Sequence, residues 1–187
     1  MSRFLTEFFE AVPWFLPGIA VWTVASALLM PATARALRTR PPVALAITVS
    51  LGFVVLATLT PNAAGLAGET VHGCNLARVG LPPLSELTAI NDTIRNIVLF
   101  MPLGFTLGLL PRTRRTTAVI GLALAAPFVI ETLQLLLPSL GRGCQSADVI
   151  DNAIGLAIGI GAAILLRLAH GWWSRRSGPR VTEPASG

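Results

Sequence analysis

The chain has 187 residues, of which 53% are hydrophobic and 12% are charged, whereas a soluble domain normally carries about a quarter charged residues. Its mean hydropathy is positive and its charges fall in short runs between long apolar stretches, which indicates an integral membrane protein. All fourteen basic side chains are Arg, without Lys, and the net charge is +5. No basic run is interleaved with aromatic residues, so we expect no nucleic-acid partner.

The first sixty residues predict a short outer segment, residues 1–10, followed by a two-helix unit, residues 11–60. Residues 11–34 are uncharged and long enough to span a bilayer, and residues 43–60 form a second apolar run. The alternative for the first run is a cleaved signal peptide, because Ala34-Arg35-Ala36 resembles a cleavage site. The length of the run and the acidic residues Glu7 and Glu10 before it favour a retained span.

Three more spans are predicted after an extracytoplasmic loop at residues 61–91. Asn91 is a suitable N-cap for a helix over residues 92–110, and Ser146 for one over residues 147–168. Between them, residues 116–137 form the fourth span. We therefore expect a three-helix core at residues 92–170, and a disordered cytoplasmic tail at residues 171–187 that is rich in Arg, Gly, Pro and Ser.

The distribution of Arg residues selects the orientation of this five-helix bundle. Placing the amino terminus outside and the carboxyl terminus inside leaves ten of the fourteen Arg residues on the inner side. These are Arg35, Arg38, Arg40, Arg112, Arg114, Arg115, Arg167, Arg175, Arg176 and Arg180. Cytoplasmic segments are enriched in positive charge, so the fold class we expect is all-α, a bundle of five transmembrane helices with the amino terminus outside.

Cys74 and Cys144 both fall on the outer, oxidising side in this topology. Two cysteines in separate outer loops favour a disulfide, and two unrelated free thiols are the alternative. Such a bridge would close a loop of about 70 residues and contribute roughly 4 kcal/mol on the chain-entropy model.

Polar residues inside the last three spans are the strongest functional signal. A carboxylate at the middle of a membrane helix costs roughly 2.5–3.5 kcal/mol on insertion scales, so such groups mark functional sites. In the predicted topology they all lie near the outer ends of their helices, and their spacing of three or four residues places each set on one helix face. We expect them to line an outward-opening acidic pocket with Arg95 and Arg142 at its rim. The candidate binding residues are Asn96, Glu131, Gln134, Arg142, Asp148, Asp151 and Asn152.

Simpler roles remain open for several of these residues. Asp148 can complement the helix dipole, Asn152 and Gln134 can be interhelical hydrogen-bond partners, and Arg95 can form an ion pair with Asp92 at the start of a helix. Two pairs of glycines, Gly104/Gly108 and Gly155/Gly159, supply small faces for close helix packing.

The chain resembles the VanZ-like membrane family over about its last hundred residues before the tail. The resemblance is carried by Asn96-x3-Phe100-Met-Pro102-Leu-Gly104-Phe105, then Glu131-x2-Gln134, then Arg142-x5-Asp148-x3-Asn152-x2-Gly155-x3-Gly159. Asp151 departs from the pattern, which has an apolar residue before the Asn. The resemblance implies a multi-pass protein of the bacterial cell membrane, in a family named for a member linked to teicoplanin resistance. It also implies that the candidate residues above, Asp151 apart, carry the family site.

Three functions are compatible with these observations. The first is a protein that binds or modulates a lipid-linked or glycan component of the envelope, with the acids accepting hydrogen bonds from amines or hydroxyls. The second is an enzyme on a lipid-linked substrate, with Glu131 and Asp148 as candidate catalytic residues and a divalent cation held by Asp148 and Asp151 as a less favoured variant. The third is a small transporter. No motif for a cofactor is present, and we expect neither a cofactor nor a resident metal.

Overall fold

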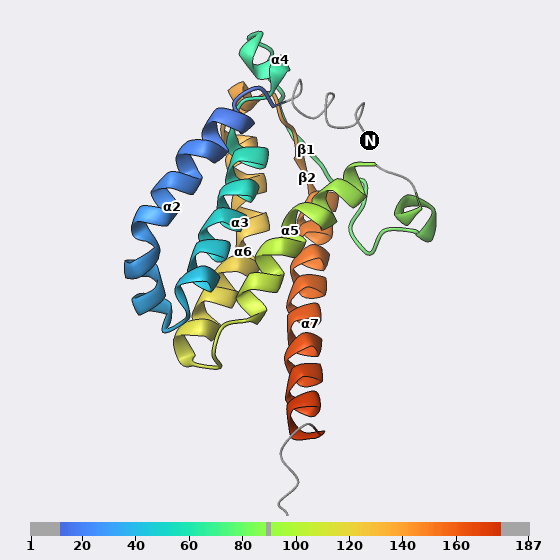
Figure 1. Ribbon diagram of the computed structural model, residues 1–187. Helices are drawn as coiled ribbons and strands as arrows, with labels where there is room; N and C mark the ends of the chain where they lie inside the picture. Colours follow the sequence, from blue (N-terminus) through green and yellow to red (C-terminus); the bar gives the residue numbers. More distant parts are fainter. Residues whose placement is uncertain (1–11, 89–90, 177–187) are drawn as a thin grey trace, which may run out of the picture.

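The computed structural model describes residues 12–88 and 91–176 of the chain. The predicted outer segment at residues 1–10 and most of the tail at residues 171–187 lie outside the described residues. Five long helices make up most of the fold (Figure 1). They are α2 (Phe15–Leu37), α3 (Pro41–Leu59), α5 (Asp92–Gly108), α6 (Arg114–Leu136) and α7 (Ser146–Arg176).

Short elements connect these helices at one end of the bundle. They are α4 (Ala63–Leu66), β1 (Cys74–Asn75), η1 (Leu84–Leu87), η2 (Pro138–Leu140) and β2 (Cys144–Gln145). We call this the disulfide end, because β1 and β2 meet there. The opposite end carries the turns between α2 and α3 and between α5 and α6, and we call it the arginine end (Figure 1).

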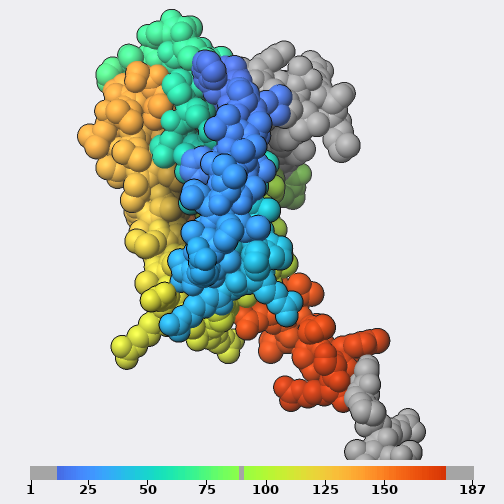
Figure 2. Space-filling model, turned by 60° about the vertical axis from the view of Figure 1, so that its left-hand side comes forward, coloured from blue at the N-terminus to red at the C-terminus, as the bar shows by residue number. Residues whose placement is uncertain are grey.

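Membrane-helix character is confirmed for most of the bundle. Within the described residues four helices, α2, α3, α6 and α7, are long and apolar enough to cross a bilayer. The third predicted span corresponds to α5, which has 17 residues and carries Asp92 and Arg95 in its first turn. The helix α7 is longer than predicted, since it continues past residue 168 to Arg176, and its last turns extend beyond the other helices (Figure 1, Figure 2).

The core forms where α5 crosses α7, and glycines make that crossing close. A methyl group added to Gly104 or Gly155 would overlap backbone atoms of the facing helix, at Leu156 and Ile97 respectively. Gly159 likewise faces the backbone of α5. The predicted small-residue faces are therefore the contact surface, because only glycine lets two backbones approach this closely.

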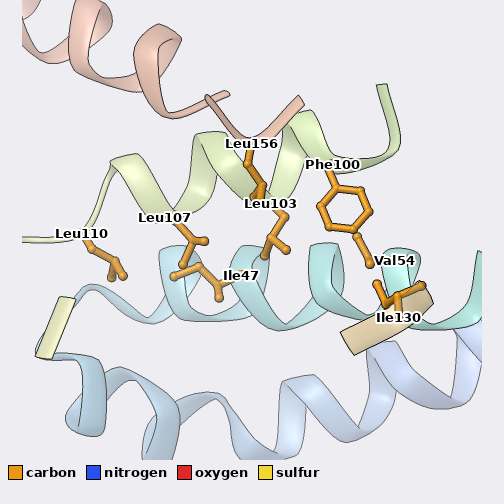
Figure 3. Packing of buried hydrophobic residues seen from close by; sticks show 8 residues of the cluster. All are labelled: Ile47, Val54, Phe100, Leu103, Leu107, Leu110, Ile130 and Leu156. Carbon is orange, nitrogen blue, oxygen red and sulfur yellow. The ribbon is translucent and has the colours of Figure 1, made fainter. Parts of the chain in front are cut away.

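Apolar side chains from four helices fill the space around this crossing. Figure 3 shows Leu103 and Phe100 of α5 between Val54 of α3 and Leu156 of α7. Phe100 and Leu156 are fully buried. Since α5 contributes the largest share of this cluster, it is the central helix although it is the shortest of the five.

The helix α2 packs on α3 and otherwise lies on the surface, along the face that Figure 2 shows. The indole of Trp22 covers Gly52 and its Nε1 donates to the carbonyl oxygen of Thr48 at 2.7 Å. Phe15 and Phe53 meet edge to face, with ring centroids 5.3 Å apart. Five large apolar side chains of α2 are exposed, as expected for a helix that faces lipid on its other sides, namely Leu16, Val21, Val24, Leu28 and Leu29.

The predicted disulfide between Cys74 and Cys144 is confirmed, with a Cα–Cα distance of 4.4 Å. The two cysteines lie opposite each other in a short parallel pairing of β1 with β2, in which Asn75 faces Gln145. This pairing was not predicted. Two residues are too short a run to show a strand pattern in the sequence, and the bridge is what holds them together.

Candidate functional site

A buried ion pair lies at the disulfide end, between the loop that follows β1 and helix α7. Nη2 of Arg78 donates to Oδ2 of Asp151 at 2.5 Å. Asp151 is fully buried, and the side chain of Arg78 is 20% exposed. The hydrogen bond to Asp151 raises the pKa of Arg78 above its ordinary value, so the guanidinium stays charged and offsets the buried carboxylate.

Arg78 also organises the residues around it. It donates to the carbonyl oxygen of Gly80 at 3.1 Å and to the hydroxyl of Thr93 on α5 at 3.3 Å. Its Nε lies 3.8 Å from Oε2 of Glu86, and the same carboxylate oxygen accepts from the Thr93 hydroxyl at 3.0 Å. One guanidinium therefore joins the loop, α5 and α7.

A polar cavity of about 310 Å³ lies beside this network. The first turns of α5 and α7 and the loop after β1 form its walls. Its lining residues are Asn75, Ala77, Arg78, Glu86, Asn91, Asp92, Thr93, Gln145, Ala147 and Asp148. The Asp148 carboxylate interacts with the side-chain amide of Asn96, one turn further along α5 than Asp92. The lining carries three carboxylates against one guanidinium, so the cavity is acidic.

The sequence predicted a pocket between the third, fourth and fifth spans, whereas this cavity lies between α5, α7 and the loop after β1. The loop after β1 forms the third wall of the cavity, and α6 contributes no lining residue. Arg95 is 3.2 Å from Asp92 on its own helix, which is the ion pair proposed above as its simpler role. Arg142 does not line the cavity.

Glu131 and Gln134 of α6 make structural contacts next to the cavity. Oε2 of Glu131 accepts from the backbone N–H of Gln145 at 2.7 Å, and Gln145 lines the cavity on its other side. Nε2 of Gln134 donates to the carbonyl oxygen of Thr58 on α3 at 3.0 Å. Both side chains are buried, and each holds a neighbouring backbone segment against α6.

Arg142 is the most heavily buried cation of the described loops. Its Nε donates to the carbonyl oxygen of Thr60 at 3.5 Å, and Nη2 has no hydrogen-bond partner among the described residues. Burial lowers the pKa of Arg142, and the nearby charge of Asp148 works against that shift. Oδ1 atoms of Asp151 and Asn152 are likewise buried and unbonded within the described residues. Ordered water normally satisfies such atoms.

By their hydrogen bonds and ion pairs, the candidate residues other than Asn152 divide into two groups, and the charge of Asp148 acts on Glu131 and Arg142 of the second group as well. Asn96, Asp148 and Asp151 belong with Arg78, at the contact of α5, α7 and the loop after β1. Glu131, Gln134 and Arg142 lie toward α3 and α6. The backbone of β2 links the groups, because Gln145 touches both Glu131 and the cavity.

Three residues of the network were missed from the sequence, namely Arg78, Glu86 and Thr93. The available signal was charge balance, since a buried acid in α7 needs a cation close by. Arg142 was the nearer candidate along the chain, and nothing in the sequence shows that the longer loop folds back over α7. Ser146 also differs from expectation, since its hydroxyl donates to the carbonyl oxygens of Arg78 at 2.8 Å and Asn75 at 3.3 Å.

The variant with a divalent cation between Asp148 and Asp151 finds no support in the geometry. Asp151 is paired with Arg78, and Asp148 interacts with Asn96. Across the part of the chain that the structure describes, no group of three His, Cys, Asp or Glu side chains is arranged to hold a metal ion.

The comparisons with known proteins agree with the resemblance seen in the sequence. The family model described as VanZ/LLP1 matches residues 44–167, more than half of the chain. The match begins in α3 and so includes a helix that carries none of the motifs quoted above. No curated protein and no solved structure matches the chain significantly. The extent of the family match shows that the chain belongs to the VanZ/LLP1 family.

Proposed function

We propose that this chain is a multi-pass protein of the bacterial cell membrane with five spans, its amino terminus outside and its carboxyl terminus inside. Ten of its fourteen Arg residues support that orientation. The helix α5, the third in chain order, would cross the membrane in addition to α2, α3, α6 and α7. Its 17 residues extend about 26 Å at 1.5 Å per residue, close to the roughly 30 Å of the hydrocarbon core. The orientation also puts the disulfide in an oxidising compartment.

A cysteine-labelling experiment tests the orientation. Ser174→Cys lies on the exposed surface near the end of α7, and Glu69→Cys lies in the exposed loop at the disulfide end. We expect a membrane-impermeant maleimide to label Glu69→Cys in intact cells and Ser174→Cys only after permeabilisation. The reverse pattern would contradict the proposed orientation.

We further propose that the acidic cavity binds an envelope component and that this binding contributes to glycopeptide tolerance. The observation that carries the proposal is the cavity lining, in which Glu86, Asp92 and Asp148 surround the single cation Arg78. Arg78 is already bonded to Asp151, Thr93 and Gly80, so it is largely occupied. The carboxylates are then the groups that meet a ligand, and they favour an ammonium group or sugar hydroxyls as hydrogen-bond donors.

Asp148 is the residue whose loss tests this function best, because it lines the cavity and lies outside the ion pair that holds the loop. Asp148→Asn keeps the shape of the side chain and removes its charge. In a teicoplanin-susceptible host we expect the wild-type chain to raise the minimum inhibitory concentration of teicoplanin, and Asp148→Asn to lose that effect at an equal membrane level.

Arg175→Gln is the matched control, since it changes one exposed charge at the opposite end of the bundle. It should retain the wild-type effect. If Asp148→Asn protected the host as well as the wild-type chain does, the cavity would not be the functional site.

A further inference from the structure

The loop that forms one wall of the cavity has two chemically different faces. We call residues 76–88 the strap. Its only charged residues are Arg78 and Glu86, and both line the cavity. Arg78 is bonded to Asp151 and lies close to Glu86, so the charges of the strap are balanced by contacts within the protein. The inward face of the strap is thus polar, and Arg78 attaches it to the bundle, while the Glu86 side chain remains 39% exposed at the cavity.

The other face of the strap is apolar and uncovered. Leu76 is 67% exposed, Val79 and Leu81 are each 79% exposed, and Leu84 is 81% exposed. Exposing four large aliphatic side chains of one short segment to water is unfavourable. This face therefore indicates a contact with an apolar surface.

The position of the strap identifies that surface. Figure 1 shows η1, in green, out to the side of the bundle at the level of the first turns of α7, whereas α4 lies beyond the ends of the helices. The strap is thus placed beside the membrane-crossing helices rather than above them. The disulfide holds one end of the strap and α5 continues from the other, so it stays at that level.

The backbone of the strap restricts its depth. Irregular backbone is not found facing the hydrocarbon core, because its N–H and C=O groups would lack hydrogen-bond partners there. The strap is irregular apart from η1, and Pro82 and Pro83 at its centre remove two of the donors that would need partners. The boundary between headgroups and acyl chains satisfies both requirements, since aliphatic side chains reach the chains while carbonyl groups remain hydrated.

We propose that the outer face of the strap is seated in the headgroup boundary of the outer leaflet, and that the cavity behind it takes the polar head of an amphiphile from the membrane. The second half of this inference rests on the proposed function of the cavity. Such a ligand presents an ammonium or hydroxyl head to Glu86, Asp92 and Asp148, and its chain lies against the apolar face of the strap. The polar cavity and the apolar strap then recognise the two parts of one molecule.

Tryptophan quenching tests the seating of the strap. Leu84→Trp places an indole at the most exposed apolar position, and Glu69→Trp places one on the exposed loop beside α4 as a matched control. Both variants are reconstituted as full chains in phosphatidylcholine vesicles, with or without lipids brominated near the headgroup end of the acyl chain. The four native Trp residues are accounted for by measuring the unsubstituted protein in the same vesicles.

We expect brominated lipids to quench the Trp fluorescence of Leu84→Trp more strongly than that of the unsubstituted protein. The fluorescence of Glu69→Trp should be quenched no more strongly than that of the unsubstituted protein. Bromine near the chain terminus should quench Leu84→Trp less than bromine near the headgroup. Quenching of Leu84→Trp by aqueous acrylamide without quenching by brominated lipid would show that the strap faces water or a protein partner, and would overturn the proposal.

A second measurement connects the strap to the ligand. Photoactivatable phospholipids with a primary-amine headgroup are crosslinked to the wild-type protein and to Asp148→Asn in the same vesicles. Crosslinks on the strap peptide that fall in Asp148→Asn support an amine-headed amphiphile in the cavity. Crosslinks unchanged by the substitution would show that lipid contacts the strap without a headgroup in the cavity, which removes the second half of the inference.

Failure of this inference is distinguishable from failure of the proposed function. If Leu84→Trp is accessible only from water and Asp148→Asn still abolishes protection against teicoplanin, the strap proposal is wrong and the cavity function stands. If brominated lipid quenches Leu84→Trp and Asp148→Asn still protects against teicoplanin as well as the wild-type chain does, the strap contacts lipid as proposed and the cavity function is wrong.

Discussion

The two ends of the bundle use the same residue type in opposite ways. At the disulfide end, Arg78 meets a fully buried carboxylate and joins three segments of the chain. At the arginine end, Arg167 donates to the backbone carbonyls of Gly108 at 3.3 Å and Leu110 at 2.9 Å, just where α5 ends. Arg115 donates to the carbonyl of Ala36 in the last turn of α2 at 3.3 Å.

The two ends differ in whether water can take over the contacts that each Arg makes. A helix end has carbonyl groups without intrahelical partners, and water satisfies them if an Arg does not. A buried carboxylate has no such substitute. The same kind of side chain should therefore contribute little at the arginine end and much at the disulfide end. At the arginine end, Arg side chains donate to carbonyl groups at helix termini. At the disulfide end, Arg78 fixes the geometry of the candidate site.

The largest effect is expected for Arg78→Met. It leaves Asp151 buried without a cation, and breaking a buried pair in this way typically costs about 3–5 kcal/mol. The free energy of unfolding, or the melting temperature in detergent, measures the loss. Arg78→Met combined with Asp151→Leu removes both charges and should recover most of the stability. A double variant as unstable as Arg78→Met would show that the pair is not the cause.

The next effect concerns the disulfide. Replacing Cys74 and Cys144 together by Ser should lower the stability by about 4 kcal/mol on the chain-entropy model, because the bridge closes a long loop. A reductant should destabilise the wild-type protein by a similar amount and leave the double Ser variant unchanged. Equal sensitivity of both proteins to reductant would contradict this explanation.

A substitution in the crossing between the two ends should have an intermediate effect. Gly155→Leu forces a side chain into the backbone of α5 at Ile97, and overpacking of this kind costs about 1–3 kcal/mol. Gly161→Leu is the control on the same helix, since a Cβ there meets no neighbour within 4 Å. Thermal unfolding of the two variants side by side should separate packing from helix propensity, which favours Leu over Gly at both positions.

The smallest effect is expected for Arg167→Met. Water can replace the guanidinium at the carbonyls of Gly108 and Leu110, so the loss should be about 0.3–1 kcal/mol, the usual range for a cation at a helix carboxyl terminus. The comparison of the two ends depends on this ranking. If Arg167→Met destabilised the protein as much as Arg78→Met does, the two ends would not differ in the way described.

Local patterns predicted much of the fold correctly. Asn91 caps α5, accepting from the backbone N–H of Ile94 at 3.0 Å, and the glycine faces form the α5–α7 contact. These features depend on residues close together in the sequence, or on a backbone that needs glycine. The disulfide was also predicted, because the topology left both cysteines in the same compartment.

The site was predicted less well, because its contacts depend on a long loop. Asp148 lines the cavity together with Arg78 and Glu86 of the strap, and these two neighbours were not predicted. The strap has no helical or strand period that would show which way Arg78 points. Glu131 was expected to reach the pocket, and instead it binds the backbone of β2, a segment whose position depends on the covalent bridge.

The bridge between β1 and β2 has a consequence for the connectivity of the whole chain. Cys74 and Cys144 enclose α5 and α6 in a covalent ring. Protease cleavage at the turn between those two helices would give two fragments that migrate together on a non-reducing gel and separate only after reduction. The ring would keep the halves of a nicked molecule attached to each other, so cleavage at that turn would not release the central helix from its neighbours.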